Sequence, residues 1–142
     1  MIFQLLLFAA LSFDSCAANP VGPAELTSTD ALVQALVQQG AAVARAGAMP
    51  ASAYPFFSVN AKRIVLNGAD VQVFEYSSAA RADTDATQVA PTGTPIGRSE
   101  IGWMDTPNFY KRDRLIVLYV GHSADVLKLL ETVLGPPFAR GQ

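Results

Sequence analysis

Few residues of this 142-residue chain are able to do chemistry, since it has one histidine, His122, and one cysteine, Cys16. Structural zinc sites use four Cys or His ligands and catalytic zinc sites typically use three protein ligands, so the composition excludes a histidine-rich zinc site. A Ser-His-Asp triad requires His122, but its neighbour Ser123 is expected to cap a helix, and the chain has no G-x-S-x-G elbow. A small hydrolase that uses His122 with a neighbouring hydroxyl or carboxylate is therefore the alternative hypothesis. A hydrogen-bonded loop histidine is the simpler interpretation.

The acidic residues and the glycine-containing segments show no catalytic spacing. Glycosidase chemistry needs a pair of carboxylates, but nothing in the sequence selects one pair among Asp70, Glu75, Glu100 and Asp105. The segment 92–97 contains two glycines, but it lacks the Lys-Ser/Thr of a phosphate-binding loop and follows an expected helix rather than a strand. We therefore predict no catalytic residue, no bound metal and no cofactor.

The position of Cys16 indicates lipid attachment and not catalysis, because this residue comes after an apolar leader. The apolar run 2–11 is shorter than the roughly 20 residues that span a bilayer, and it matches the apolar region of a secretory signal. Cys16 lies where a bacterial lipoprotein carries its acylated cysteine. Ser15 fits that lipobox motif, whereas Phe13 and Asp14 depart from it.

Three interpretations of the leader stay open at this stage. Acylation of Cys16 leaves an exported protein that is lipid-anchored in the cell membrane or envelope. Cleavage after Ala17 or Ala18 removes Cys16 and releases a soluble secreted protein. The third interpretation is a buried N-terminal helix. We favour acylation, with residues 1–16 as the signal peptide and residues 17–27 as a flexible tether.

Composition predicts a single folded domain, 28–142, without a nucleic-acid partner. Hydrophobic residues make up 51% of the chain and charged residues 15%, which is unlike a disordered protein. The formal net charge of −2 leaves no basic excess for nucleic acid. The short basic cluster at 111–114 is interpreted as a solvated loop. With one cysteine, no disulfide can form within the chain, so the core alone must hold the fold.

The order of the expected elements predicts the fold class. Capping residues and apolar stripes predict helices that begin near residues 28, 78 and 123. The pair Asn67-Gly68 predicts a hairpin between strands 63–66 and 71–76, and the apolar run 115–120 predicts a central strand. Further strands are expected at 41–46, 99–104 and 109–111. This order favours an α+β fold, a two-layer sandwich of a mostly antiparallel sheet with helices mainly on one face. The ferredoxin-like arrangement is one option for its connections.

The aromatic residues of the loops form the candidate binding surface. Aromatic side chains at loop tips are good anchors for peptide or protein partners. In so small a domain we favour a core role for these rings, in which they close an open face of the sheet, since burial stabilises each by about 1.5–3 kcal/mol. The candidate residues are Tyr54, Phe56, Phe57, Trp103, Phe109 and Tyr110.

Three segments of the C-terminal half, 107–110, 115–121 and 134–139, resemble small uncharacterised bacterial lipoproteins. In those proteins a capped helix and a valine-rich hairpin also precede the Phe-Tyr pair. The resemblance covers most of residues 29–139. It implies an extracytoplasmic domain of unknown role, without a catalytic residue to carry over. We therefore expect a membrane-tethered, non-catalytic binding or accessory module, whose partners are the membrane, through the lipid anchor, and a protein of the envelope.

Overall fold

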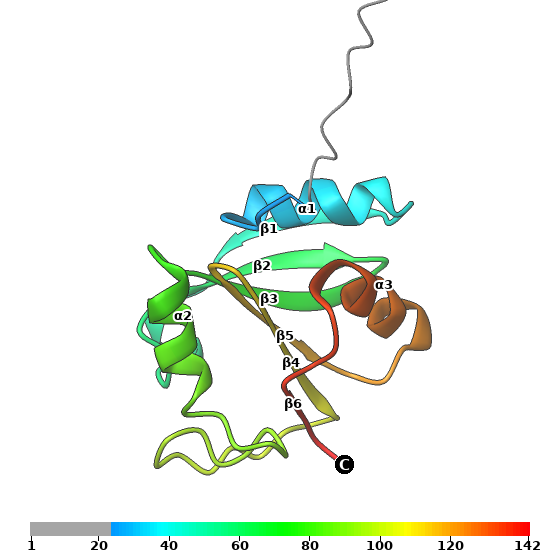
Figure 1. Cartoon of the computed structure of the whole chain (residues 1–142). Coiled ribbons are helices and arrows are strands. Elements are labelled where there is room, and N and C mark those ends of the chain that lie inside the picture. Colours follow the sequence, from blue (N-terminus) through cyan, green and yellow to red (C-terminus); the bar gives the residue numbers. More distant parts are fainter. Residues whose placement is uncertain (1–23) are drawn as a thin grey trace, which may run out of the picture.

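The computed structural model describes residues 24–142, so the leader, Cys16 and residues 17–23 of the expected tether lie outside the described residues. None of the described helices is long and apolar enough to cross a membrane. In chain order (Figure 1) the elements are α1 (Thr29–Gln38), β1 (Val43–Ala48), the short 3-10 helix η1 (Ala51–Ala53), β2 (Ala61–Leu66), β3 (Ala69–Glu75), α2 (Ala79–Ala86), β4 (Pro107–Arg112), β5 (Leu115–Val120), α3 (Ala124–Leu134) and β6 (Ala139–Arg140).

The described strands form an antiparallel sheet in the order β1-β2-β3-β5-β4-β6. The apolar run of β5 lies between β3 and β4, and its residues 115–118 are fully buried. This confirms the central strand that the sequence predicts. With three helices packed on the sheet, the chain has the predicted α+β fold.

The hairpin between β2 and β3 forms at the predicted turn. Asn67 and Gly68 have φ values of 48° and 83°, the left-handed conformation that these two residue types tolerate best. The Asn67 side chain also accepts a hydrogen bond from the Ala42 amide at 2.8 Å. The turn therefore fixes both the hairpin register and the start of the edge strand β1.

Different elements cover the two faces of the sheet. On one face, α1 and α3 pack on a cluster that includes Val73 and Val117. On the opposite face, α2 and two long loops pack on a cluster that includes Phe74 and Phe109. Two of the three helices thus share a face. The described residues thus supply a hydrophobic cluster on each face of the sheet.

Two crossovers explain why α2 and α3 lie on opposite faces. β3 and β4 are parallel and flank β5, and the connection between them contains α2. β5 and β6 are parallel and flank β4, and their connection contains α3. Both connections cross the sheet toward the β6 edge, but the strands from which they start, β3 and β5, run in opposite directions. Two crossovers of one hand therefore place their helices on opposite faces. The split β-α-β unit is a feature that this sheet shares with ferredoxin-like folds.

The strand expected at 99–104 is absent, and these residues belong to a loop. The loop satisfies its own polar groups: the Ile101 amide donates to Thr94 Oγ1 at 3.1 Å, and the Trp103 indole donates to the Gly93 carbonyl at 2.9 Å. The strand expected at 109–111 is present as part of the longer strand β4, which begins at Pro107 and forms a hairpin with β5. Proline is tolerated there because it is the first residue of the strand. The two-residue strand β6 was not predicted.

Leu26, which the sequence places in the tether, is part of the packed domain. Its side chain is only 3% exposed and belongs to the cluster under α1 and α3. Its amide donates to Asp113 Oδ2 at 2.7 Å, and its carbonyl accepts from the Arg114 amide at 3.3 Å. The chain therefore enters the fold beside the turn between β4 and β5.

The segment 111–114, which spans the end of β4 and this turn, is a structural junction and not the solvated loop that the sequence suggested. Each of its four residues contacts another part of the chain. Lys111 forms an ion pair with Asp83 of α2, and Arg112 donates a hydrogen bond to the Val133 carbonyl of α3. Asp113 accepts from the Leu26 amide, and Arg114 donates to the Tyr76 carbonyl.

Candidate binding groove

Two long loops meet beside the C-terminal end of β5. The loop 49–60 connects β1 to β2, and the loop 87–106 connects α2 to β4. The loop 87–106 is longer than the roughly 12–15 residues above which loops without helices or strands become uncommon in compact domains, and ordered loops of that length are usually functional. Binding residues are also concentrated on loops that a rigid scaffold positions. These loops are therefore the first place to look for a site.

Internal contacts fix the shape of the loop 87–106. Besides the hydrogen bonds of Thr94 and Trp103, Ile96 forms bridges with Val89 and Ser99, and its side chain is buried. Gly93 has a φ of 81°, and a Cβ atom built on it would lie 2.8 Å from the Pro107 side chain. Glycine is therefore required at this close approach.

Aromatic packing and one buried carboxylate attach the loop 49–60 to the rest of the domain. Phe57 is buried and meets Phe74 edge to face, with 4.7 Å between ring centroids. The Asp85 carboxylate of α2 accepts hydrogen bonds from the Ser58 amide and hydroxyl, both at 2.7 Å, and from the Tyr76 hydroxyl at 2.9 Å. Burial, and then the hydrogen bond to Asp85, raise the pKa of Tyr76 well above its ordinary value. The tyrosine thus stays neutral and remains a donor to Asp85.

The two loops enclose an apolar groove with a cavity volume of about 390 Å³. Tyr54 and Phe56 line it from one loop, Ile101 and Trp103 from the other, and Val120 closes it at the end of β5. Its rim also carries Met104, whose side chain is fully exposed to solvent. We call this surface the Met104 groove.

The structure separates the six aromatic residues of the predicted binding surface into two groups. Tyr54, Phe56 and Trp103 line the Met104 groove and are only partly buried. Phe57, Phe109 and Tyr110 are buried in the core. Tyr110 even lies on the opposite face of the sheet, under the helices α1 and α3. The sequence did not single out Ile101, Met104 and Val120, because it assigned all three to strands.

His122 and Asp105 form a pair beside this surface. The Nδ1 atom of His122 lies 2.9 Å and 3.1 Å from the two carboxylate oxygens of Asp105. The Thr106 amide and then His122 lower the pKa of the Asp105 carboxyl. The histidine side chain is 83% exposed. Among the described residues, no Ser or Thr hydroxyl makes a hydrogen bond to this ring.

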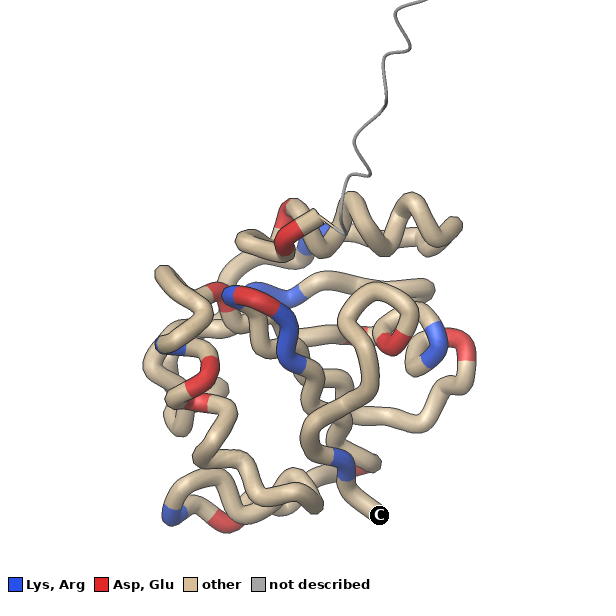
Figure 2. Tube along the Cα trace, in the orientation of Figure 1, with Lys and Arg blue, Asp and Glu red and all other residues tan. Residues whose placement is uncertain are grey.

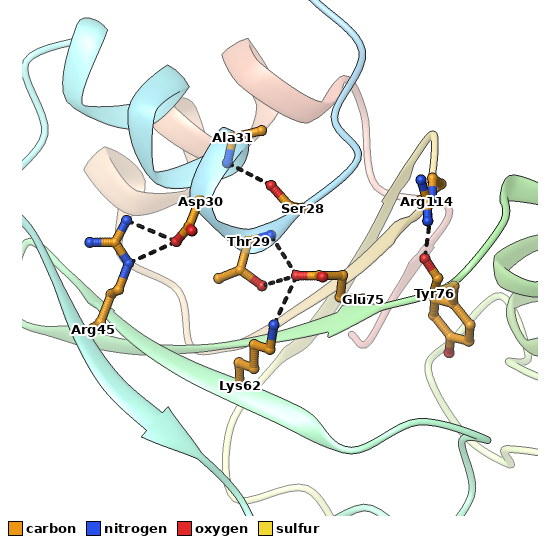
Figure 3. A network of polar contacts seen from close by, with 9 residues as sticks. All are labelled: Ser28, Thr29, Asp30, Ala31, Arg45, Lys62, Glu75, Tyr76 and Arg114. Carbon is orange, nitrogen blue, oxygen red and sulfur yellow. Dashed lines mark hydrogen bonds and ion pairs between the residues drawn. The ribbon is translucent and has the colours of Figure 1, made fainter.

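A second polar arrangement lies at the N-terminus of α1 (Figure 3). The Oε2 atom of Glu75 accepts from the Thr29 amide at 2.8 Å, from the Thr29 hydroxyl at 2.9 Å and from Lys62 Nζ at 3.0 Å. Asp30 pairs with Arg45 at 2.9 Å. Burial alone would raise the pKa of Glu75, but the bonds from Thr29 and Lys62 lower it below its ordinary value. Glu75 therefore adds to the Ser28 cap of α1 by accepting from the first helical amide, and we assign it no catalytic role.

No family model, curated protein or solved structure matches this chain. The part of the chain that the structure describes also holds no group of three or more His, Cys, Asp or Glu side chains arranged for a metal ion.

Proposed function

We propose that this chain is a membrane-tethered domain outside the cytoplasm that acts as a non-catalytic binding or accessory module. The Met104 groove is the observation that supports a binding role. An exposed methionine on the rim of an apolar groove is typical of surfaces that contact other proteins. The apolar leader and Cys16 support the tether, as does the resemblance to small bacterial lipoproteins.

The position of the groove suits such a tether. The Leu26 carbonyl accepts a hydrogen bond from the Arg114 amide, just before β5 begins. Val120 lines the groove where β5 ends. A strand of this length extends about 20 Å. Figure 1 shows the described chain starting beside α1, at the end of the domain opposite the loop 87–106. A protein held through residues before Ala24 would therefore present the groove away from the membrane.

Affinity capture from envelope extract, with the tether retained, tests the binding role. We would compare the wild type with Met104→Asp, which places a charge on the groove rim. Val37→Asp is the matched control, because Val37 is 51% exposed on α1, away from the groove. We expect the wild type and Val37→Asp to retain the same partner and Met104→Asp to lose it. A partner that binds all three proteins equally would exclude the groove.

The competing function is a small hydrolase in which Asp105 orients His122. The short Nδ1–carboxylate distances favour it, because a carboxylate at this nitrogen orients a general base. Hydrolysis of p-nitrophenyl acetate tests it. A hydrolase requires that His122→Ala abolish the activity and that Asp105→Asn lower it at least tenfold. We expect the wild type, His122→Ala and Asp105→Asn to hydrolyse the ester at the same background rate.

A further inference from the structure

We propose that the Met104 groove takes a second copy of this chain, in a two-fold symmetric dimer in which Met104 of each copy enters the groove of the other. The inference rests on the proposed function only in treating this groove as the contact surface. The partner it names is the chain itself.

The surface is complementary to itself. A two-fold contact requires the same patch on both copies, so a projection and a recess must lie next to each other. Met104 is such a projection, since it is fully exposed and belongs to neither hydrophobic cluster. The recess lies directly beside it, between Tyr54, Phe56 and Val120. An unbranched methionine is well suited to fill an irregular apolar recess.

The charges on the rim are also arranged for pairing between two copies. Arg98 and Glu100 are exposed on the same loop as Met104, and neither forms an ion pair with another described residue. In the proposed dimer the two-fold axis passes near Ser99, which lines the groove, so the two copies of the loop run antiparallel and Arg98 of one copy comes near Glu100 of the second. The opposite rim, 49–60, has no charged residue that would repel its partner. The contact is therefore complementary in charge as well as in shape.

The overall charge permits association of like copies. The net charge of −2 is small, and Figure 2 shows basic and acidic residues interspersed along the described chain. Repulsion between two copies is therefore weak. The groove and its rim nevertheless involve far fewer than the 20–30 residues per side of a stable interface. We expect a dissociation constant on the order of 100 µM in solution, and a tether that confines copies to one surface would raise their effective concentration.

Sedimentation velocity of the chain from Ala17 onward tests the proposal. This segment contains every described residue and both hydrophobic clusters. We expect the sedimentation coefficient to rise from that of a monomer near 5 µM to that of a dimer near 1 mM. Met104→Glu should weaken dimerisation at least tenfold, whereas Val37→Glu, at the exposed valine of α1, should leave it unchanged. Trp103 lies in the groove and is the only tryptophan of the chain, so its emission should shift over the same concentrations.

A charge exchange tests the geometry of the dimer. Arg98→Glu alone and Glu100→Arg alone should each weaken dimerisation about fivefold, because each places like charges together. The double variant Arg98→Glu/Glu100→Arg should restore the wild-type dissociation constant. A protein that stays monomeric up to 1 mM, or a dimer that tolerates Met104→Glu, overturns the proposal. If the monomer still captures an envelope protein through Met104, this inference fails while the proposed binding function stands. A shift in Trp103 emission with phosphatidylcholine vesicles, and none with protein concentration, would assign the groove to lipid instead.

Discussion

At the residue scale, Asp85 is the polar side chain on which the arrangement of the loop 49–60 depends most. Its carboxylate is buried and accepts from Ser58, Tyr76 and Gln88. Asp85→Ala leaves these donors without an acceptor, and we expect a loss of about 3 kcal/mol in the free energy of unfolding. Urea denaturation measures it. Asp83→Ala on the same helix is the control.

The control separates the buried carboxylate from an exposed one. The Asp83 side chain is largely exposed and forms a surface pair with Lys111. Such pairs contribute about 0–1 kcal/mol, so Asp83→Ala should change stability little. If the two variants lost equal stability, the Asp85 hydrogen bonds would have no special role in holding the loop.

Glu75 is expected to make stability depend on pH. Its pKa in the folded protein lies below the ordinary value of 4.5, so its ionised form stabilises the fold above about that pH. This contribution is lost as the pH falls through the lowered pKa.

Glu75→Gln should cost about 1 kcal/mol at pH 7, because it weakens the cap of α1. The difference from the wild type should shrink in acid. Chemical denaturation near pH 7 and near pH 3 measures both, with the exposed Glu25→Gln as control. A difference that stays constant with pH would contradict the assignment.

Part of the site was predictable residue by residue. Aromatic residues in or beside segments that contain proline were selected as candidates, and three of them, Tyr54, Phe56 and Trp103, line the groove. It did not distinguish them from Phe57 and Phe109, since the same residue types serve a core and a groove equally well. The full exposure of Met104 was not predictable, because it depends on how two loops distant in sequence meet.

At the scale of elements, β5 is expected to be the strand least tolerant of charge. Val117 is fully buried under α1 and α3. Val117→Asp buries a carboxylate without a partner, and we expect it to cost more than about 4 kcal/mol and abolish the cooperative thermal transition. Circular dichroism during heating measures this. Ala44→Asp, at an exposed position of the edge strand β1, should melt like the wild type. A cooperative melt of Val117→Asp would show that β5 is not the interior strand.

The elements that the sequence predicted are those with a local physical signal. Ser28 and Ser78 cap α1 and α2 as expected, with side chains that accept from Ala31 and Arg81. The Asn67-Gly68 turn needs only its own residue types. The absent strand at 99–104 had the right composition, but Thr94 and Gly93 bind its polar groups within the loop. Hydrogen bonds between residues seven and ten positions apart leave no pattern that distinguishes this loop from a strand. The short strand β6 likewise exists only because β4 offers an edge.

At the scale of the whole molecule, the fold class followed from the order of the elements, whereas the strand order did not. Alternation of hairpins with helices is enough to indicate an antiparallel sheet. The placement of β5 between β3 and β4 depends on the crossover from β3 to β4, and the placement of β6 beyond β4 depends on the crossover from β5 to β6. The opposite placement of Leu26 and the Met104 groove then follows from the direction of β5. The position of the proposed tether therefore decides which way the groove faces, because an anchor at the other end of the domain would turn the groove toward the lipid.

The tether itself is tested at Cys16. A diacylglycerol thioether and an amide-linked acyl chain together supply the two or more membrane signals that stable anchoring requires. We expect the wild type to partition with membranes and Cys16→Ala to remain unprocessed or leave the lipid fraction. Asp14 places a charge where the peptidase expects a small neutral residue, so Asp14→Ala should raise the yield of mature protein. Intact-mass measurement distinguishes the outcomes. A mature protein that begins at Ala18 or Asn19 without lipid mass would show a secreted domain, and the Met104 groove would then have no fixed orientation to a membrane.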